Sequence, residues 1–133
     1  MEKTTYKPQE VTFRNASFSY DADKRSYSGL GIVFNSDSLP LHIYDETRGI
    51  IQVVERITPD SIREARMDDV VASFNHNFEK ILGRTSAGTL TLSVTDEGVG
   101  YRFTVPETTY GNDLLISTQR GDIQGSSFMF SMD

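Results

Sequence analysis

The sequence predicts a mainly β domain of the α+β class, in which short, mostly antiparallel strands are flanked by short helices. Three observations support this prediction. Several short segments alternate apolar with polar residues, which is typical of half-buried strands. Glycine-rich segments separate some of these strands, as in β-hairpins. Only two segments combine a polar cap with the apolar spacing of a helix, and the 133 residues fit one domain, residues 1–133.

The N-terminal part contains strand segments with a change of phase between them. Val11 and Phe13 share one face, and the alternation resumes at Ala16 with a shifted phase. A bulge or a tight turn near Asn15 would explain the shift. Residues 26–35 then place three apolar side chains on one face, namely Leu30, Ile32 and Phe34.

The next segments are predicted to be a loop, a strand and a helix. Residues 36–49, "SDSLPLHIYDETRG", indicate an exposed loop, and residues 50–57, "IIQVVERI", indicate an apolar strand covered on both faces. A helix begins after Thr58, because threonine can cap the first turn and Pro59 suits the first helical position. Residues 68–76 return to strand.

The C-terminal part is predicted to hold a hairpin, a second helix and a last strand. The hairpin alternates inward residues on both sides of a glycine-rich turn: Leu90, Leu92, Val94, Tyr101, Phe103 and Val105. The helix begins at Thr108 or Thr109 and ends at residues 120–121. Residues 125–133 form an aromatic strand, which we expect to have an open sheet edge.

Composition excludes several classes of protein. The chain has no cysteine, which rules out disulfides, thiolate zinc sites and a cysteine nucleophile. The net charge is −6 with scattered Lys and Arg, which argues against a nucleic-acid-binding surface. The apolar runs are too short to span a membrane, and the N-terminus lacks the apolar core of a signal peptide. These features predict a soluble intracellular domain.

His76 is the first candidate for chemistry. It has the same strand parity as Val70, Ala72 and Phe74, so we expect its imidazole to share their apolar face. A partly buried packing role is one interpretation, and a general base is the other. A zinc site is not indicated, since "HNFEK" lacks the paired histidines of a zinc-protease helix.

Three more residues are candidates for a site. Ser126 and Ser127 follow Gly125, which permits a close backbone approach and leaves N–H groups free to face an oxyanion. Either serine could instead be a polar strand start. Arg84 could orient a substrate carbonyl or stabilise a developing charge, or it could be an ordinary surface arginine.

The order of four short motifs is similar to that of a known family. The motifs are "GLGIVFNS", "VVERITPDSI", "FNHN" followed by "LGRTSAGTL", and "TTYGNDLL" followed by "QRGDIQGSSFMF". From about Tyr27 to Phe130 the chain resembles the prohead proteases of tailed bacteriophages, capsid-maturation serine peptidases related in fold to herpesvirus assemblin.

The resemblance implies a fold and a pair of catalytic residues. The fold is a small, mostly antiparallel β-barrel flanked by short helices. The family's catalytic histidine falls on His76 and its serine on Ser127, with Ser126 in the preceding variable position; Met129 replaces the usual glycine. In the family an acidic third residue lies in strands beyond this point, so we expect a domain truncated at its C-terminus. Loss of that acid can lower turnover by about 10⁴.

The implied function is a serine endopeptidase that cleaves scaffold protein, or the scaffold-like part of the major capsid protein, and itself. It would act inside the assembling prohead in the bacterial cytoplasm, without a cofactor, metal, membrane or nucleic acid. Self-association through an exposed strand edge is a further expectation. The alternative is a catalytically silent assembly or scaffold-binding module on the same fold, and a ligand-binding β-barrel without a phage role is a third hypothesis.

Overall fold

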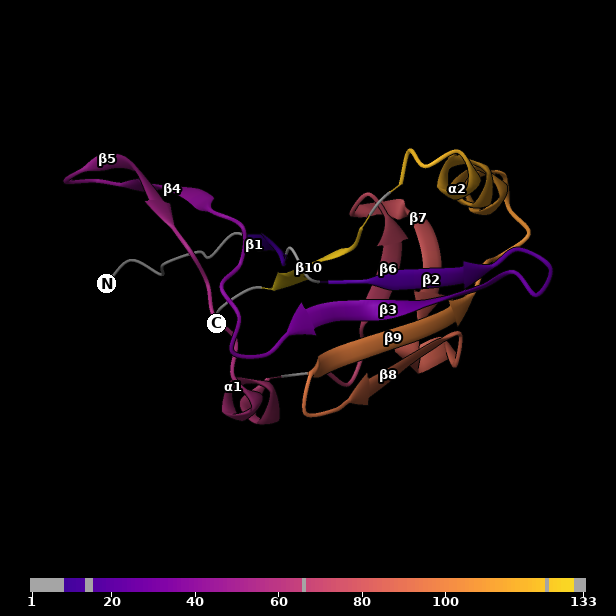
Figure 1. Cartoon of the computed structure of the whole chain (residues 1–133), viewed down its shortest axis with the longest axis horizontal. Coiled ribbons are helices and arrows are strands. Elements are labelled where there is room, and N and C mark those ends of the chain that lie inside the picture. The colour runs from indigo at the N-terminus through magenta and orange to yellow at the C-terminus, as the bar shows by residue number, and fades with distance from the viewer. Residues whose placement is uncertain (1–8, 14–15, 66, 124, 131–133) are drawn as a thin grey trace.

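The computed structural model describes residues 9–13, 16–65, 67–123 and 125–130, and its elements are labelled in Figure 1. The strands are β1 (Gln9–Thr12), β2 (Phe18–Asp21), β3 (Ser26–Val33), β4 (Leu41–Asp45), β5 (Gly49–Val53), β6 (Val71–Phe74), β7 (Asn77–Arg84), β8 (Leu90–Val94), β9 (Gly98–Thr104) and β10 (Ser127–Phe130). The helices are α1 (Pro59–Glu64), the 3₁₀ turn η1 (Thr85–Ala87) and α2 (Thr109–Gln119).

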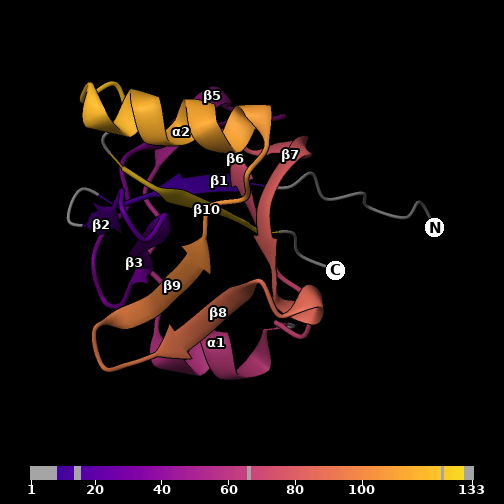
Figure 2. The ribbon, with the colours of Figure 1, turned by 90° about the vertical axis from the view of Figure 1, so that its right-hand side faces the viewer.

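The predicted mainly β, α+β class is confirmed. The order β2-β3-β9-β8 forms a four-stranded antiparallel sheet, and three antiparallel pairs, β1–β10, β4–β5 and β6–β7, complete the described strands. Figure 2 shows α2 above this sheet and α1 below it. The described strands thus form four separate sheets, and the closed barrel that the resemblance implied is not confirmed.

Both predicted helices begin at their predicted caps. The hydroxyl of Thr58 accepts a hydrogen bond from the backbone N–H of Ser61 at 3.3 Å, which satisfies a free donor of the first turn of α1. Thr108, rather than Thr109, caps α2 by accepting from the N–H of Gly111 at 3.1 Å. These short-range signals depend on local chemistry alone, which is why the sequence predicts them well.

Two apolar clusters hold the fold together. The first joins α2 to the large sheet through Tyr27, Leu82, Leu90, Phe103, Val105, Leu114 and Leu115. The second lies under β1 and contains Val11, Phe13, Ile32, Val33, Phe34 and Val99. The rings of Phe13 and Phe128 stack with their centroids 5.9 Å apart, so the second cluster also supports β10.

A buried polar pair fixes α2 on the sheet. The hydroxyl oxygens of Tyr27 and Thr118 are 2.8 Å apart, and Thr118 donates its own proton to the carbonyl of Leu114 at 2.7 Å. The Tyr27 hydroxyl is therefore the donor of the pair. Burial is the main reason why the pKa of Tyr27 lies above its usual value.

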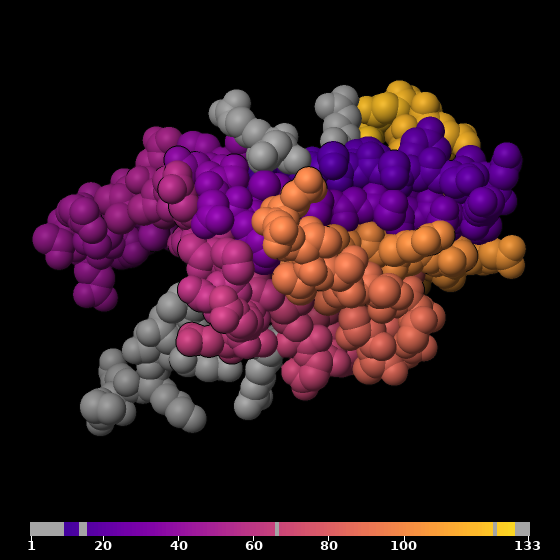
Figure 3. Space-filling view, turned by 60° about the horizontal axis from the view of Figure 1, so that its bottom comes forward, coloured from indigo at the N-terminus to yellow at the C-terminus, as the bar shows by residue number. Residues whose placement is uncertain are grey.

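The predictions for residues 36–57 were wrong in two respects. The expected loop contains β4, which pairs with β5 in a hairpin that projects from the molecule (Figures 1 and 3). The expected doubly covered strand leaves Ile50 75% exposed, and its cross-strand partner Tyr44 is equally exposed. We call residues 41–53 the arm.

The phase shift after Phe13 corresponds to a change of sheet. Asn15 lies outside the described residues; before it β1 pairs with β10, and after it β2 pairs with β3. Among the described strands, β10 pairs with β1 alone, so its other edge is open, as the sequence predicted. None of the described helices is long and apolar enough to cross a membrane.

Candidate active site

His76 occupies the tip of the β6–β7 hairpin. Phe74 pairs with Asn77, so the connection contains two residues, Asn75 and His76, with φ of 53° and 55°. Two consecutive positive φ values match a type I′ turn, which continues the twist of the flanking strands. Asn and His enter this region more readily than most residues do, at a free-energy cost of about 1 kcal/mol or more each. The prediction that His76 continues the apolar face of a strand was therefore wrong, because β6 ends at Phe74.

Ser127 begins β10 and meets His76 from a distant part of the sequence. The Nε2 atom of His76 lies 2.6 Å from Oγ of Ser127, although 51 residues separate the two positions. The His76 side chain is 24% exposed, so the pair is partly shielded while it remains reachable. Direct contact between a serine hydroxyl and an imidazole is the arrangement that a serine nucleophile and its general base require.

Glu10 of β1 is a third member of the contact, although no sequence motif marks it. Its Oε1 accepts a hydrogen bond from Ser127 Oγ at 3.1 Å and lies 3.6 Å from Nε2 of His76. Strand register explains the placement. Thr12 pairs with Ser127, and Glu10 lies two residues from Thr12 on the same face of the strand. The sequence does contain one signal, namely the apolar Val11 next to Glu10. Because Val11 is buried and neighbouring strand residues face opposite sides, Glu10 faces away from the core.

Glu10 does not take the position of the orienting acid of a catalytic triad. That acid binds Nδ1 of the histidine, whereas Glu10 approaches Nε2. Among the described residues, no carboxylate other than Glu10 forms an ion pair with His76.

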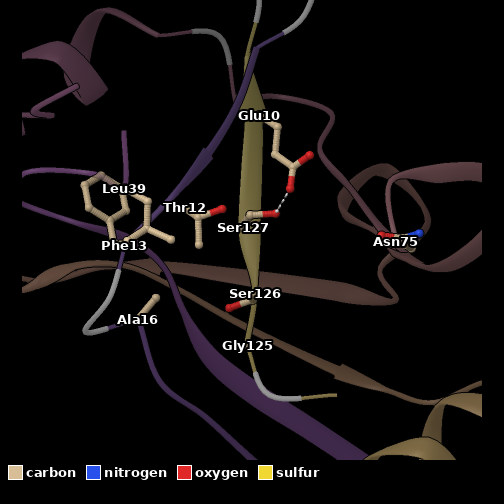
Figure 4. A pocket seen from close by; sticks show the side chains of 9 residues that line it. All are labelled: Glu10, Thr12, Phe13, Ala16, Leu39, Asn75, Gly125, Ser126 and Ser127. Atoms are coloured by element: carbon tan, nitrogen blue, oxygen red, sulfur yellow. Dashed lines mark hydrogen bonds between the residues drawn. The ribbon is translucent and has the colours of Figure 1, made fainter. Parts of the chain in front are cut away.

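Ser126 lies beside Ser127 in the sequence, but its side chain faces away from that of Ser127. Figure 4 shows the two serine side chains on opposite sides of the strand. Ser126 donates to the backbone carbonyl of Leu30 at 3.2 Å and also contacts the hydroxyl of Tyr101. The pKa of Tyr101 is raised mainly by burial, with the Ser126 hydrogen bond acting in the opposite direction. Ser126 thus fastens the start of β10 to the large sheet.

The structure does not bring Arg84 to Ser127. Arg84 ends β7, and the strand of eight residues that starts next to His76 spans more than about 20 Å. Its guanidinium donates three hydrogen bonds to the carboxylate of Asp69, at 3.0, 3.1 and 2.6 Å. That pairing, together with a hydrogen bond from Ser86, lowers the pKa of Asp69 from 3.8 to about 2.

A pocket of about 420 Å³ opens beside Ser127 (Figure 4). It is lined by Glu10, Thr12, Phe13, Ala16, Leu39, Asn75, Gly125, Ser126 and Ser127. A side chain at Gly125 would meet no atom within 4 Å, so the backbone before Ser127 is open to a ligand. Within the described ranges, no cluster of three or more acidic or histidine side chains could hold a metal ion.

Comparison with known proteins gives one family. Residues 12–133 match the family model described as caudovirus prohead serine protease. The matched range contains both His76 and Ser127, while Glu10 lies just before it. No curated protein and no solved structure matches the chain.

Proposed function

The chain belongs to the caudovirus prohead serine protease family, a family of capsid-maturation proteases, and we propose that Ser127 and His76 are its catalytic residues. The 2.6 Å contact between Ser127 Oγ and His76 Nε2 is the observation that carries this proposal. The proposed substrates are scaffold protein, or the scaffold-like part of the major capsid protein, and the protease itself, cleaved inside the assembling prohead.

The geometry supports a two-stage acyl transfer. Ser127 Oγ attacks the peptide carbonyl carbon while its proton passes to Nε2 of His76. The C–N bond then breaks, His76 gives the proton to the leaving amine, and an acyl ester remains on Ser127. Water activated by His76 hydrolyses the ester. In this proposal the oxyanion is held by backbone N–H groups of the open segment at Gly125 rather than by Arg84.

A fluorophosphonate probe tests the assignment directly. The full chain should be labelled at Ser127, and labelling should disappear in Ser127→Ala. Ser126→Ala is the matched control, since Ser126 faces Leu30 and should not be needed for labelling. Labelling at Ser126, or at neither serine, would refute Ser127 as the nucleophile.

The second candidate is a silent assembly or scaffold-binding module on the same fold. It is favoured by one observation: no described acid other than Glu10 pairs with His76, and Glu10 lies at Nε2 rather than at Nδ1. This candidate predicts that scaffold protein binds the chain and stays intact, with no probe labelling. Mass spectrometry of scaffold co-expressed with the chain, and with Ser127→Ala, separates the two candidates.

A further inference from the structure

Glu10 is held firmly at its backbone, while its side chain is mostly exposed to solvent. Val11 is fully buried and Phe13 is 2% exposed, so β1 is fixed by the second apolar cluster. The Glu10 side chain is 58% exposed and reaches from this fixed strand to Ser127. A ligand that enters the pocket at Ser127 therefore lies close to the Glu10 carboxylate.

The described lining of the pocket carries negative charge on one side only, at Glu10. Of the described residues that line it, Glu10 is the single ionisable one, and the others are neutral. No described cation forms an ion pair with Glu10 other than His76, which is cationic only when protonated. The carboxylate thus attracts a positive group next to the nucleophile and repels a negative one.

The hydrogen bonds of the site without ligand connect the Glu10 carboxylate to the proton transfer from Ser127 to His76. Ser127 Oγ has one proton, so it donates either to Glu10 at 3.1 Å or to His76 Nε2 at 2.6 Å. If Oγ donates its proton to Glu10, then Nε2 of His76 must carry a proton of its own to form a hydrogen bond with Oγ. A protonated Nε2 cannot accept the serine proton. A cation that forms an ion pair with the Glu10 carboxylate removes this competing acceptor, so that Ser127 donates its proton to His76 instead.

We propose that Glu10 is a specificity-determining residue that makes the site prefer peptides with a basic side chain, Lys or Arg, next to the scissile bond. This inference rests on the proposed function, because it names the substrate class of the same site. An ammonium or guanidinium bound to the part-exposed carboxylate is expected to raise kcat/KM about tenfold over a neutral isostere.

Matched peptides test the preference. A peptide library is first digested and its products are sequenced by mass spectrometry, which identifies the cleaved bond. Peptides with lysine, norleucine or glutamate beside that bond are then compared through kcat/KM. The native chain should cleave the lysine peptide about tenfold faster than the norleucine peptide, and the glutamate peptide slowest. Glu10→Gln should bring the lysine-to-norleucine ratio close to one, and Glu10→Lys should favour the glutamate peptide.

Two controls separate the possible failures. Glu46→Gln removes an exposed carboxylate in the turn of the arm and should keep the tenfold preference. The fluorophosphonate probe, which carries no basic group, reports the nucleophile in every variant. Normal labelling without a lysine preference, or a preference that survives Glu10→Gln, would overturn the inference and leave the proposed function intact. Loss of labelling in Glu10→Gln would also overturn it, because Glu10 would then be needed for the nucleophile itself. An unlabelled native chain would overturn both.

Discussion

At the scale of single residues, the site depends on a histidine in an unusual backbone conformation. His76 has a φ of 55°, so most substitutions there would disturb the turn as well as the chemistry. Asparagine is the best replacement, because it tolerates this region and carries no basic nitrogen. We expect His76→Asn to lower turnover by about 10²–10⁴ while the melting temperature stays within a few degrees.

His42 provides the matched control for this experiment. It is the other histidine of the chain and lies exposed on β4, away from the pocket. His42→Asn should therefore leave both turnover and melting temperature unchanged. Near-native turnover in His76→Asn would show that another group accepts the serine proton.

The sequence predicts part of the site, and the missing part has a physical reason. His76 and Ser127 can be named from motifs because each lies in a recognisable short stretch. Strand parity wrongly placed His76 in a strand, because the two-residue turn contains no glycine that would mark it. Asn75 and His76 adopt the positive φ values of the turn themselves. Glu10 lies in no motif, and its placement beside Ser127 follows only from the register between β1 and β10.

At the scale of elements, the β6–β7 hairpin carries His76 at its closed end and an ion pair at its open end. Arg84 and Asp69 form this pair, and it lowers the pKa of Asp69 from 3.8 to about 2. A carboxyl group with a lowered folded-state pKa stabilises the fold above its unfolded pKa, and this stabilisation is lost as the pH falls through the folded pKa. The contribution of Asp69 is thus present above about pH 4 and lost toward pH 2.

Asp69→Asn should remove this part of the pH dependence. We expect the free energy of unfolding of the variant to fall less between pH 5 and pH 2 than that of the native chain, as measured by urea denaturation. High salt should shrink the difference, since the pair is exposed to solvent. Asp68→Asn is the control, because the neighbouring Asp68 forms no ion pair among the described residues and should retain the native pH dependence. Equal pH dependence in Asp69→Asn and native chains would contradict the stabilising role.

The sequence predicts the helix caps and most of the strands, but it does not predict which distant strands pair. Thr58 and Thr108 cap their helices because each hydroxyl bonds an N–H three residues away. Apolar character alone could not tell how many faces of residues 50–57 are covered. Ile50 is apolar yet 75% exposed, and it lies in a hairpin whose two strands pair only with each other among the described strands.

At the scale of the whole molecule, the second apolar cluster packs against β10, the strand that carries the proposed nucleophile. Phe13 is 2% exposed and stacks on Phe128, the residue after the proposed nucleophile. The cluster therefore fixes both β1, which carries Glu10, and β10, which carries Ser127. The pairing of strands near opposite ends of the sequence is a long-range contact, which no local pattern reveals.

The arm, in contrast, lies outside both clusters except at Leu41, which packs against the second one. A two-stranded hairpin has marginal stability in water, so its outer part should contribute little to global unfolding. We expect the double variant Tyr44→Thr, Ile50→Thr to change the free energy of unfolding by less than about 0.5 kcal/mol, because these side chains are 75% exposed and threonine suits a strand. Labelling of Ser127 by the fluorophosphonate should also remain at the native rate.

Phe13→Ala is the contrasting variant for the same two measurements. Removal of this buried ring should lower the free energy of unfolding by about 3–5 kcal/mol, and it should also slow the labelling of Ser127, because β10 loses its stacked support. If the arm variant lost more than about 1 kcal/mol, its exposed pair would belong to the cooperative unit of the fold. If it kept its stability but lost labelling, the arm would act on the site through contacts other than the shared core. Only native behaviour in the arm variant, beside a loss in Phe13→Ala, supports a site that depends on the second cluster and not on the arm.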